Sequence, residues 1–250
     1  MSHHPTRMSS LAIIMVLFVW EIGVAIAELP AYLLPAPSVI GRRLWQELAT
    51  PMFQTHVGAT LAVVITGLLL AVSSGTLIAW LLYRYRMLYM TMNGLFTLTQ
   101  AIPILAIAPL VYVWIPNPFW ARCFVAWLIT VFPIYAATYT GLQRIPRELH
   151  EVAALAGATR WQALLTYEAP LALPVVLSGM RVSMALATTG AVVGEFLGGR
   201  DGMGALINIA RGLFDTPLLF VAIVVLASIT MLLTTLFVSL ERMVLARYGD

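Results

Sequence analysis

The chain has 250 residues, of which 61% are hydrophobic and only 10% are charged. A soluble domain carries far more charge, so the composition excludes an ordinary soluble protein and indicates a polytopic membrane protein. The formal net charge is +3, without a basic patch suited to nucleic acid, and the single cysteine, Cys123, excludes an internal disulfide framework.

The first apolar segment spans residues 11–27 and carries Glu21. Arg7 before it and Ala25-Ile26-Ala27 at its end also fit a signal peptide with a small-residue cleavage site. The apolar run is long for a signal peptide, so the sequence favours a first transmembrane helix that is retained.

Residues 34–52 predict an external segment lying in the membrane interface. Leu34-Pro35-Ala36-Pro37-Ser38 supplies two rigid turns and a candidate N-cap at Ser38, before a helix from Val39 to Leu48. One face of this helix is apolar, which is typical of a helix resting on the membrane surface. A direct role in receiving a binding protein is the alternative. The charged residues that fall away from the apolar face are Arg42, Arg43 and Glu47.

Five further apolar segments are each long enough to cross about 30 Å of hydrocarbon, which takes roughly 20 residues. The third of the six spans contains Pro103 and Pro109 and should be kinked. With a cytoplasmic N-terminus, eight arginines lie inside, among them Arg7 and Arg247, and five lie outside or at the outer interface, among them Arg122. This bias is consistent with both termini being cytoplasmic. The predicted fold is an all-α polytopic membrane protein with about six transmembrane helices. The five segments lie within 57–82, 87–115, 123–143, 182–194 extended backward past Arg181, and 216–240.

A charged, alanine-rich loop at 146–168 separates the fourth and fifth spans. Pro146 can start a helix, and Glu148 and Glu151 suit the positive N-terminal end of that helix. Gly157 indicates a turn or a tight contact, because glycine inside a helix costs about 1 kcal/mol relative to alanine. The alanines, among them Ala153 and Ala158, leave a small surface that a partner can approach closely.

A second helical stretch begins at Thr159-Arg160-Trp161. Pro170 and Pro174 follow it and should limit how it joins the fifth span.

This loop resembles the EAA loop of permease subunits of ATP-binding-cassette (ABC) importers, whose pattern is E-A-A-x3-G-x9-I-x-L-P. Glu151, Ala153, Gly157 and Pro170 match at the right spacing. Three positions depart from the pattern: Val152, Tyr167 and Ala169. Further motifs recur in order over roughly residues 30–245, and together they resemble permeases for sulfonates, taurine, nitrate and thiamine-pyrimidine precursors. These motifs are Leu34-Pro35-Ala36-Pro37-Ser38, Ala101-Ile102-Pro103, Phe132-Pro133-Ile134, Gly179-Met180-Arg181 and Gly194-Glu195-Phe196-Leu197-Gly198.

The resemblance implies a type I ABC importer-like permease, with residues 1–250 forming a single transmembrane domain. It further implies a homodimer in a bacterial inner membrane, two cytoplasmic ATPase subunits and an extracytoplasmic substrate-binding protein. Residues 146–168 would be the coupling loop, and no cofactor is implied. The residues expected to couple to the ATPase are Glu148, Glu151, Ala153, Gly157, Ala158 and Arg160.

The sequence offers no site for ATP hydrolysis, because all fourteen basic residues are arginine and a phosphate-binding P-loop requires lysine. His150-Glu151 begins like a zinc-protease motif, but Ala154 stands where the second histidine is needed. We therefore expect no catalytic or metal site, and an ATPase on a separate subunit.

The fifth span is the best candidate for the transport pathway. Arg181, Thr188 and Glu195 are seven residues apart, so they share one face of a straight helix. A charge in the membrane costs on the order of 3 kcal/mol, which favours a position toward protein or water. Arg181 could instead reach the interface, and Glu195 could pair with Arg200 or Arg211. The predicted packing residues on a nearly opposite face are Gly190, Gly194 and Gly198.

Two classes of function fit these observations. The first is a permease subunit of an ATP-driven importer that moves a sulfonate, a nitrate-like anion or a small heterocycle. The second is a stand-alone secondary transporter, which would normally show internal repeats and carboxylates at the membrane midplane.

The aromatic residues Trp114, Trp127, Tyr135 and Tyr139 would suit a planar heterocycle, or would simply pack against helices or lipid.

Overall fold

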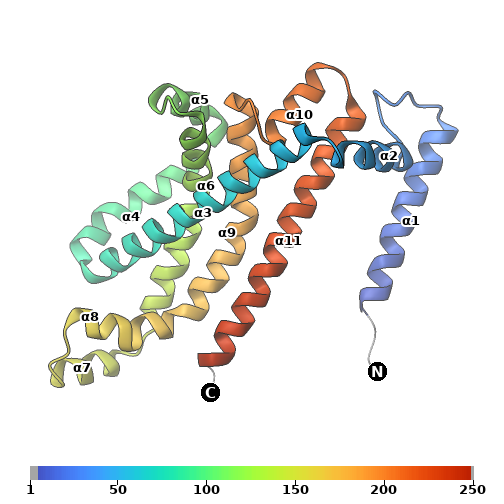
Figure 1. Ribbon diagram of the computed structural model, residues 1–250. Coiled ribbons are helices and arrows are strands. Elements are labelled where there is room, and N and C mark those ends of the chain that lie inside the picture. Colours follow the sequence, from blue (N-terminus) through green and yellow to red (C-terminus); the bar gives the residue numbers. More distant parts are fainter. Residues whose placement is uncertain (1–4, 249–250) are drawn as a thin grey trace.

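The computed structural model describes the backbone of residues 5–248 and the side chains of 11–92, 94 and 102–246, so the predicted inner-side charges Arg7 and Arg247 lie outside the described side chains. Within these residues the chain is helical and contains no strand (Figure 1). The helices are α1 (Pro5–Ile26), α2 (Pro37–Leu48), α3 (Pro51–Arg84), α4 (Arg86–Ala101), α5 (Ile104–Trp114), α6 (Pro118–Gln143), α7 (Arg147–Leu155), α8 (Arg160–Ala163), a π-helical turn (Leu164–Glu168), α9 (Ala169–Gly198), α10 (Met203–Gly212) and α11 (Thr216–Tyr248).

Four of the described helices are long and apolar enough to cross a membrane, and two shorter helices are also apolar. In chain order they overlap the six predicted segments, although only Ile104–Trp114 represents the third segment, 87–115. This order confirms the predicted all-α polytopic fold. The long helices are Pro51–Arg84, Pro118–Gln143, Arg160–Gly198 and Thr216–Ala246, and the shorter ones are Leu11–Ile26 and Ile104–Trp114.

The third span is broken rather than kinked. α4 ends at Ala101, and Ile102 and Pro103 adopt extended backbone angles before α5 begins. The cause is steric, because a proline ring disfavours the helical conformation of the residue before it. α4 and α5 therefore run in different directions (Figure 1). Pro109, in contrast, lies inside α5 without ending it.

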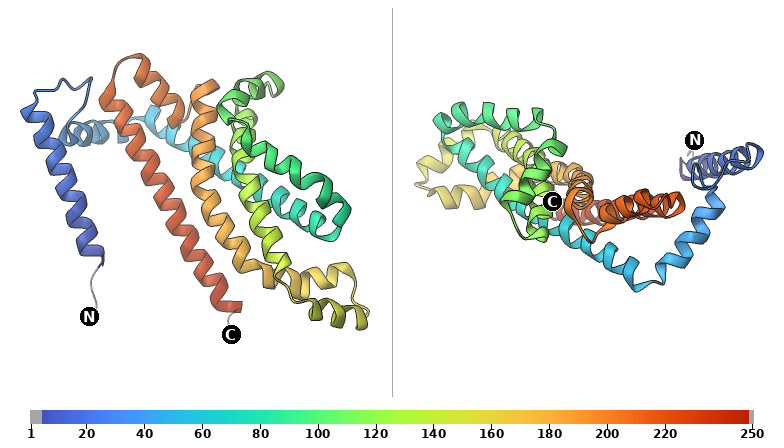
Figure 2. Two further views of the ribbon diagram at one scale, coloured as in Figure 1. Left: turned by 180° about the vertical axis from the view of Figure 1, so that it is seen from behind. Right: turned by 90° about the horizontal axis from the view of Figure 1, so that it is seen from above.

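The loop helices α7 and α8 lie at the same end of the bundle as the N-terminal end of α1 and the C-terminal end of α11, and α2 and α10 lie at the opposite end (Figure 2). α1 stands beside α11 and meets it through Trp20 and Phe220, whose ring centroids are 5.6 Å apart. The predicted external segment and the predicted cytoplasmic loop are thus at opposite ends.

The start of α2 differs from the prediction that Ser38 caps the helix. The helix begins at Pro37, with Ala36 as its N-cap. The amide N–H and the hydroxyl of Ser38 instead donate to the two carboxylate oxygens of Glu21, at 2.9 and 2.7 Å. Glu21, the one acid of the first apolar segment, therefore connects α1 to α2.

α6 lies between α3 and α9, and small residues bring the three backbones close together. A Cβ added at Gly190 of α9 would lie 2.7 Å from the Cα of Ala126 in α6, and one at Gly67 of α3 would lie 2.7 Å from the Ala126 Cβ. Neither site has room for a methyl group. Small residues let helix backbones approach closely in membranes, where van der Waals packing replaces the hydrophobic effect as the main driving force.

We predict that Gly190→Ala lowers the thermal stability of the purified protein in detergent. The added methyl group would meet the α6 backbone, and overpacking of this kind costs about 1–3 kcal/mol. Gly58→Ala on α3 is the matched control, because a Cβ there meets nothing within 4 Å and alanine favours helix by up to about 1 kcal/mol. Equal melting temperatures for the two variants would contradict the packing described here.

Candidate functional site

The loop between α6 and α9 is shaped by its capping residues. α7 ends at Leu155, and Gly157, two residues beyond, has a φ of +68°. The amide of Ala158 donates to the carbonyl of Ala153 and that of Gly157 to the carbonyl of Ala154, at 2.9 and 3.1 Å. This pattern is a Schellman motif, which favours glycine in the left-handed position. Thr159 then starts α8 with a capping box.

The surface of the loop is largely exposed, and part of it is apolar. Leu155 is 89% exposed and Val152 is 62% exposed. Such side chains on a short helix outside the bundle are typical of a surface that a protein partner covers. Of the predicted coupling residues, Ala153 is half-buried and the others are exposed: Glu148, Glu151, Gly157, Ala158 and Arg160.

The junction of the loop with the fifth span is a continuous helix, although Pro170 and Pro174 were expected to limit it. α8 passes through the π-helical turn Leu164–Glu168 directly into α9. The π-helical turn comes immediately before Pro170, which has no amide N–H to donate, and Pro174 lies within α9. The second helix of the loop and the helix of the fifth span are therefore one structural element.

Glu168, the last residue of the π-helical turn, is fully buried. Arg84 at the end of α3 donates to its Oε1 at 3.2 Å, and the Trp80 indole donates to its Oε2 at 3.4 Å. A buried carboxylate is tolerated only when it is paired and hydrogen-bonded, so this position fixes α3 against the start of α9.

A histidine extends these contacts to α7. His150 Nε2 lies 2.9 Å from the Tyr83 hydroxyl, and its Nδ1 lies 2.7 Å from the Tyr167 hydroxyl. We call Tyr83, Arg84, His150, Tyr167 and Glu168 the inner polar cluster.

Aromatic contacts add to the inner polar cluster. Trp161 of α8 stacks on Trp80, with ring centroids 5.9 Å apart. Arg160 donates to the hydroxyl of Tyr85 at 3.1 Å. Both helices of the loop are thus connected to the end of α3.

Sequence reasoning identified the exposed residues of the loop but missed the inner polar cluster. Glu168 stands at the unrestricted position of the I-x-L-P segment, where the family pattern gives no signal. The available signal was physical: an acid among apolar residues at a membrane end needs a cation, and Arg84 ends the second span.

The three predicted pathway residues have three different environments. Arg181 is exposed on the protomer, whereas Thr188 is only 5% exposed and donates to the Met184 carbonyl at 3.4 Å. Glu195 is fully buried. Their role in a pathway stays a prediction.

Glu195 is surrounded by the start of α10 rather than by the arginines considered as partners. Its Oε2 accepts from the Thr60 hydroxyl and from the Gly204 amide, both at 2.9 Å. Thr60 in turn accepts from the Met203 amide at 2.8 Å. A carboxylate here satisfies free N–H groups of a helix N-terminus and complements its dipole. Arg200 is exposed, and Arg211 donates to Asn208 at 3.1 Å.

Arg122 occupies a buried position close to this end of the bundle. Its Nη1 donates to the side chain and the backbone carbonyl of Asp201, at 2.8 and 2.7 Å. The predicted orientation places Arg122 outside or at the outer interface and names no partner for it. We call His56, Thr60, Arg122, Glu195 and Asp201 the outer polar cluster; His56 Nδ1 accepts from the Gly202 amide at 3.0 Å.

The three glycines predicted for helix packing lie close to neighbouring helices. Gly190 and Gly194 face Ala126 and Arg122 of α6, and Gly198 lies against the ring of Tyr112 in α5. The Tyr112 hydroxyl donates to the Gly194 carbonyl at 2.7 Å.

The predicted aromatic residues have different surroundings. Tyr139 stacks on Tyr89 at 4.7 Å and lies 6.0 Å from the buried Tyr135. Trp127 donates to Ser74 at 2.8 Å, and Trp114 is 64% exposed.

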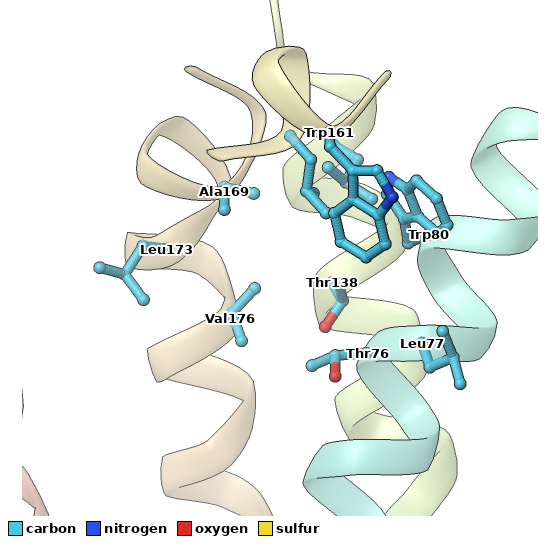
Figure 3. Close-up of a pocket in the computed structure, with 11 residues that line it drawn as sticks. Thr76, Leu77, Trp80, Thr138, Trp161, Ala169, Leu173 and Val176 are labelled. Carbon is cyan, nitrogen blue, oxygen red and sulfur yellow. The ribbon is translucent and has the colours of Figure 1, made fainter. Parts of the chain in front are cut away.

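A cavity of about 360 Å³ opens where α3, α6 and α9 meet the loop (Figure 3). Trp80 and Trp161 lie at one end of it, and the hydroxyl groups of Thr76 and Thr138 line it among apolar side chains. A second cavity of similar volume, lined in part by Trp120, Phe124 and Trp127, lies between α3 and α6.

Residues 71–249 match the family model described as "Binding-protein-dependent transport system inner membrane component". The chain belongs to this family, and it is a multi-pass inner-membrane permease subunit of an ABC importer. This result decides against a stand-alone secondary transporter.

Several relatives are named for small solutes. The riboflavin transport system permease protein RibX of Chloroflexus aurantiacus is 45% identical over 92% of this chain and 86% of its own length. The formylaminopyrimidine transport permease protein ThiX of Halalkalibacterium halodurans is 34% identical over 87% of this chain and 86% of its own. The putative aliphatic sulfonates permease SsuC of Bacillus subtilis is 25% identical over 92% of this chain and 83% of its own.

The fold is similar to that of a solved ABC transporter. An inward-facing structure of the MetNI methionine ABC transporter superposes with a TM-score of 0.69 and 19% identity, covering 78% of this chain and 99% of that chain. At this identity the likeness establishes the fold alone.

We predict that Glu168→Gln lowers ATP-driven uptake several-fold, while ATPase activity of the assembled importer persists. The variant keeps the shape of the side chain but weakens its pairing with Arg84, so motion of the loop is transmitted poorly. Glu47→Gln is the control, because Glu47 pairs with Arg43 four residues away on one helix and such pairs contribute little.

A double-variant test separates this pairing from general damage. Arg84→Gln and Glu168→Gln remove the same ion pair, so their effects on uptake and on melting temperature should not add. Strictly additive effects would show that the two residues act independently.

Proposed function

We propose that this chain forms a homodimer whose two copies enclose the transport pathway of an importer. Two ATPase subunits bind the loops at 146–168, and a substrate-binding protein delivers solute to the opposite side. The observation that carries this proposal is the loop itself. It matches the coupling pattern of the family, presents apolar side chains outside the bundle, and continues as one helix into α9.

The proposed orientation places both termini and the loop in the cytoplasm. Support comes from the arrangement of the helices, since the described ends of α1 and α11 lie at the end of the bundle that carries α7 and α8. The amphipathic α2 and the short α10 then face outward, where the binding protein docks.

Transport proceeds by alternating access. ATP binding brings the two ATPase subunits together and moves the loops that rest on them. Because α8 continues into α9 and the inner polar cluster holds α3, this motion reaches both transmembrane helices. The outer side opens to receive solute, and hydrolysis restores the inward-facing state.

The proposed substrate is a planar heterocycle rather than a sulfonate or a nitrate-like anion. The relatives named for riboflavin and for a formylated aminopyrimidine are 45% and 34% identical to this chain, whereas the sulfonate relative is 25% identical. Both cavities between the helices are lined by indole rings and contain no arginine. An electropositive site for an anion is not evident among these lining residues.

We predict that Gly157→Leu uncouples or dissociates the ATPase while the membrane fold remains intact. A leucine at φ +68° is strained and would break the turn between α7 and α8. Glu151→Lys should act in the same direction by reversing an exposed charge on α7. Copurification of the ATPase and solute uptake are the measurements.

Gly212→Leu is the control for ATPase copurification only, because α10 lies on the side proposed for docking of the binding protein. Gly212 is also exposed and has open space around it, but it lies at the other end of the bundle and has no positive φ. Normal ATPase binding and normal uptake in both Gly157→Leu and Glu151→Lys would contradict the proposed coupling role of the loop.

The substrate proposal predicts saturable uptake of radiolabelled riboflavin or a formylated aminopyrimidine into proteoliposomes. The vesicles contain the permease with its ATPase and binding protein, and ATP is supplied on the ATPase side. Vesicles without the ATPase should show no uptake, because this chain lacks the lysine of a P-loop. Uptake of taurine but of neither heterocycle would overturn the substrate class.

A further inference from the structure

The cavity below the loop combines two features that point to a ligand. Its walls come from α3, α6 and α9, and its upper end is formed by Trp161 of the loop helix α8 (Figure 3). Its volume of about 360 Å³ lies within the range of small-molecule sites, which are mostly apolar with a few placed polar groups.

The first feature is an unsatisfied hydroxyl group. Thr138 of α6 is only 6% exposed, and its Oγ1 has no hydrogen-bond partner among the described residues. The side chain lines the cavity, and Figure 3 shows its oxygen directed into it. Buried polar groups are nearly always paired, so an unpaired one at a cavity wall indicates a partner that is not part of the chain.

The second feature is a stacking surface. Trp161 is 66% exposed, although one side of its indole stacks on Trp80. Aromatic rings favour offset stacking on one another. The cavity therefore offers an indole face at one end and a free hydroxyl group on its wall.

We propose that this cavity binds the aromatic ring system of the transported solute at the inner end of its path, stacked against Trp161 and hydrogen-bonded to Thr138. The assignment rests on the proposed function for the identity of the solute. A lipid acyl chain would fill the same apolar volume but would leave Thr138 unpaired, so the hydroxyl favours a heterocycle with a polar edge.

The site connects solute to the coupling loop. An occupant would contact Trp161, which belongs to the helix that enters α9, and Thr138 on α6 at the same time. Thr76 adds a second hydroxyl oxygen, which donates to the Val72 carbonyl at 2.6 Å and can still accept. The solute would thus meet the loop just before release.

The test measures riboflavin binding to the permease–ATPase complex in lipid nanodiscs. Binding is monitored by the quenching of flavin fluorescence that stacking on an indole causes. The wild type should bind saturably. Thr138→Val should raise the Kd about fivefold, as expected for one hydrogen bond, and Thr138→Ser should restore it. Leu173→Trp, which fills the cavity from α9, should abolish binding.

Thr130→Val is the matched control on the same helix. Thr130 is fully buried, but its hydroxyl donates to the Ala126 carbonyl at 2.7 Å, so its loss should leave riboflavin binding unchanged. Equal loss of binding in Thr130→Val and Thr138→Val would show general damage and overturn the assignment of Thr138.

The outcomes separate this site from the proposed function. If the full importer takes up riboflavin but Leu173→Trp does not alter riboflavin binding, the site is overturned and the transport function stays intact. Absence of saturable riboflavin binding to the wild type, in an importer that takes up riboflavin, would also overturn the site. The substrate class is decided by the uptake measurement alone.

Discussion

The buried carboxylate of Glu168 is the constraint on which the inner half of the molecule depends. It lies at the point where the loop becomes a transmembrane helix, and it is held by Arg84 and Trp80 of α3. An unpaired charge at this depth would be costly, which favours keeping α3 and the start of α9 together. The loop cannot move without carrying this junction.

A second buried carboxylate performs the corresponding task at the opposite end of the same helix. Glu195 accepts from the Thr60 hydroxyl of α3 and from the Gly204 amide at the start of α10. Between the two acids, α6 packs against both helices through Gly67 and Gly190. α3, α6 and α9 therefore form one block that is fixed at both ends, which is the kind of unit expected to move as a rigid body between two transport states.

Much of this arrangement follows from local sequence rules. Apolar run lengths predict the spans, and Gly157 predicts the turn of the loop because few other residues adopt a positive φ there. The break at Pro103 and the continuous passage through Pro170 show the limit of such rules, since a proline ends one helix and not the other. The backbone before the two prolines differs: Ile102 is extended before Pro103, whereas a helical backbone with a π-helical turn leads to Pro170, and neither has a simple sequence signal.

The polar clusters could not be predicted from spacing alone. Arg181, Thr188 and Glu195 are seven residues apart, but this spacing does not reveal the partners of Glu195, which are Thr60 of α3, far away in the chain, and Gly204 at the start of α10. The contacts of Glu168 with Arg84 and of Arg122 with Asp201 likewise join residues that no short motif connects. Sequence shows that buried charges need partners, whereas only the fold shows which ones are near.

The central claim is that the loop and the α3–α6–α9 block move together. Distance measurements between spin labels at Ala154 in α7 and Leu69 in α3 test it directly, both positions being exposed and the buried Cys123 being replaced by alanine. Labelled chains are mixed with excess unlabelled chains, so that one protomer of a dimer carries both labels. The account predicts that this distance is the same with and without ATP. In a second sample, in which every chain is labelled at Ala154 alone, the distance between the two copies in the proposed dimer should change with ATP. A change within the protomer as large as the change between protomers would contradict it.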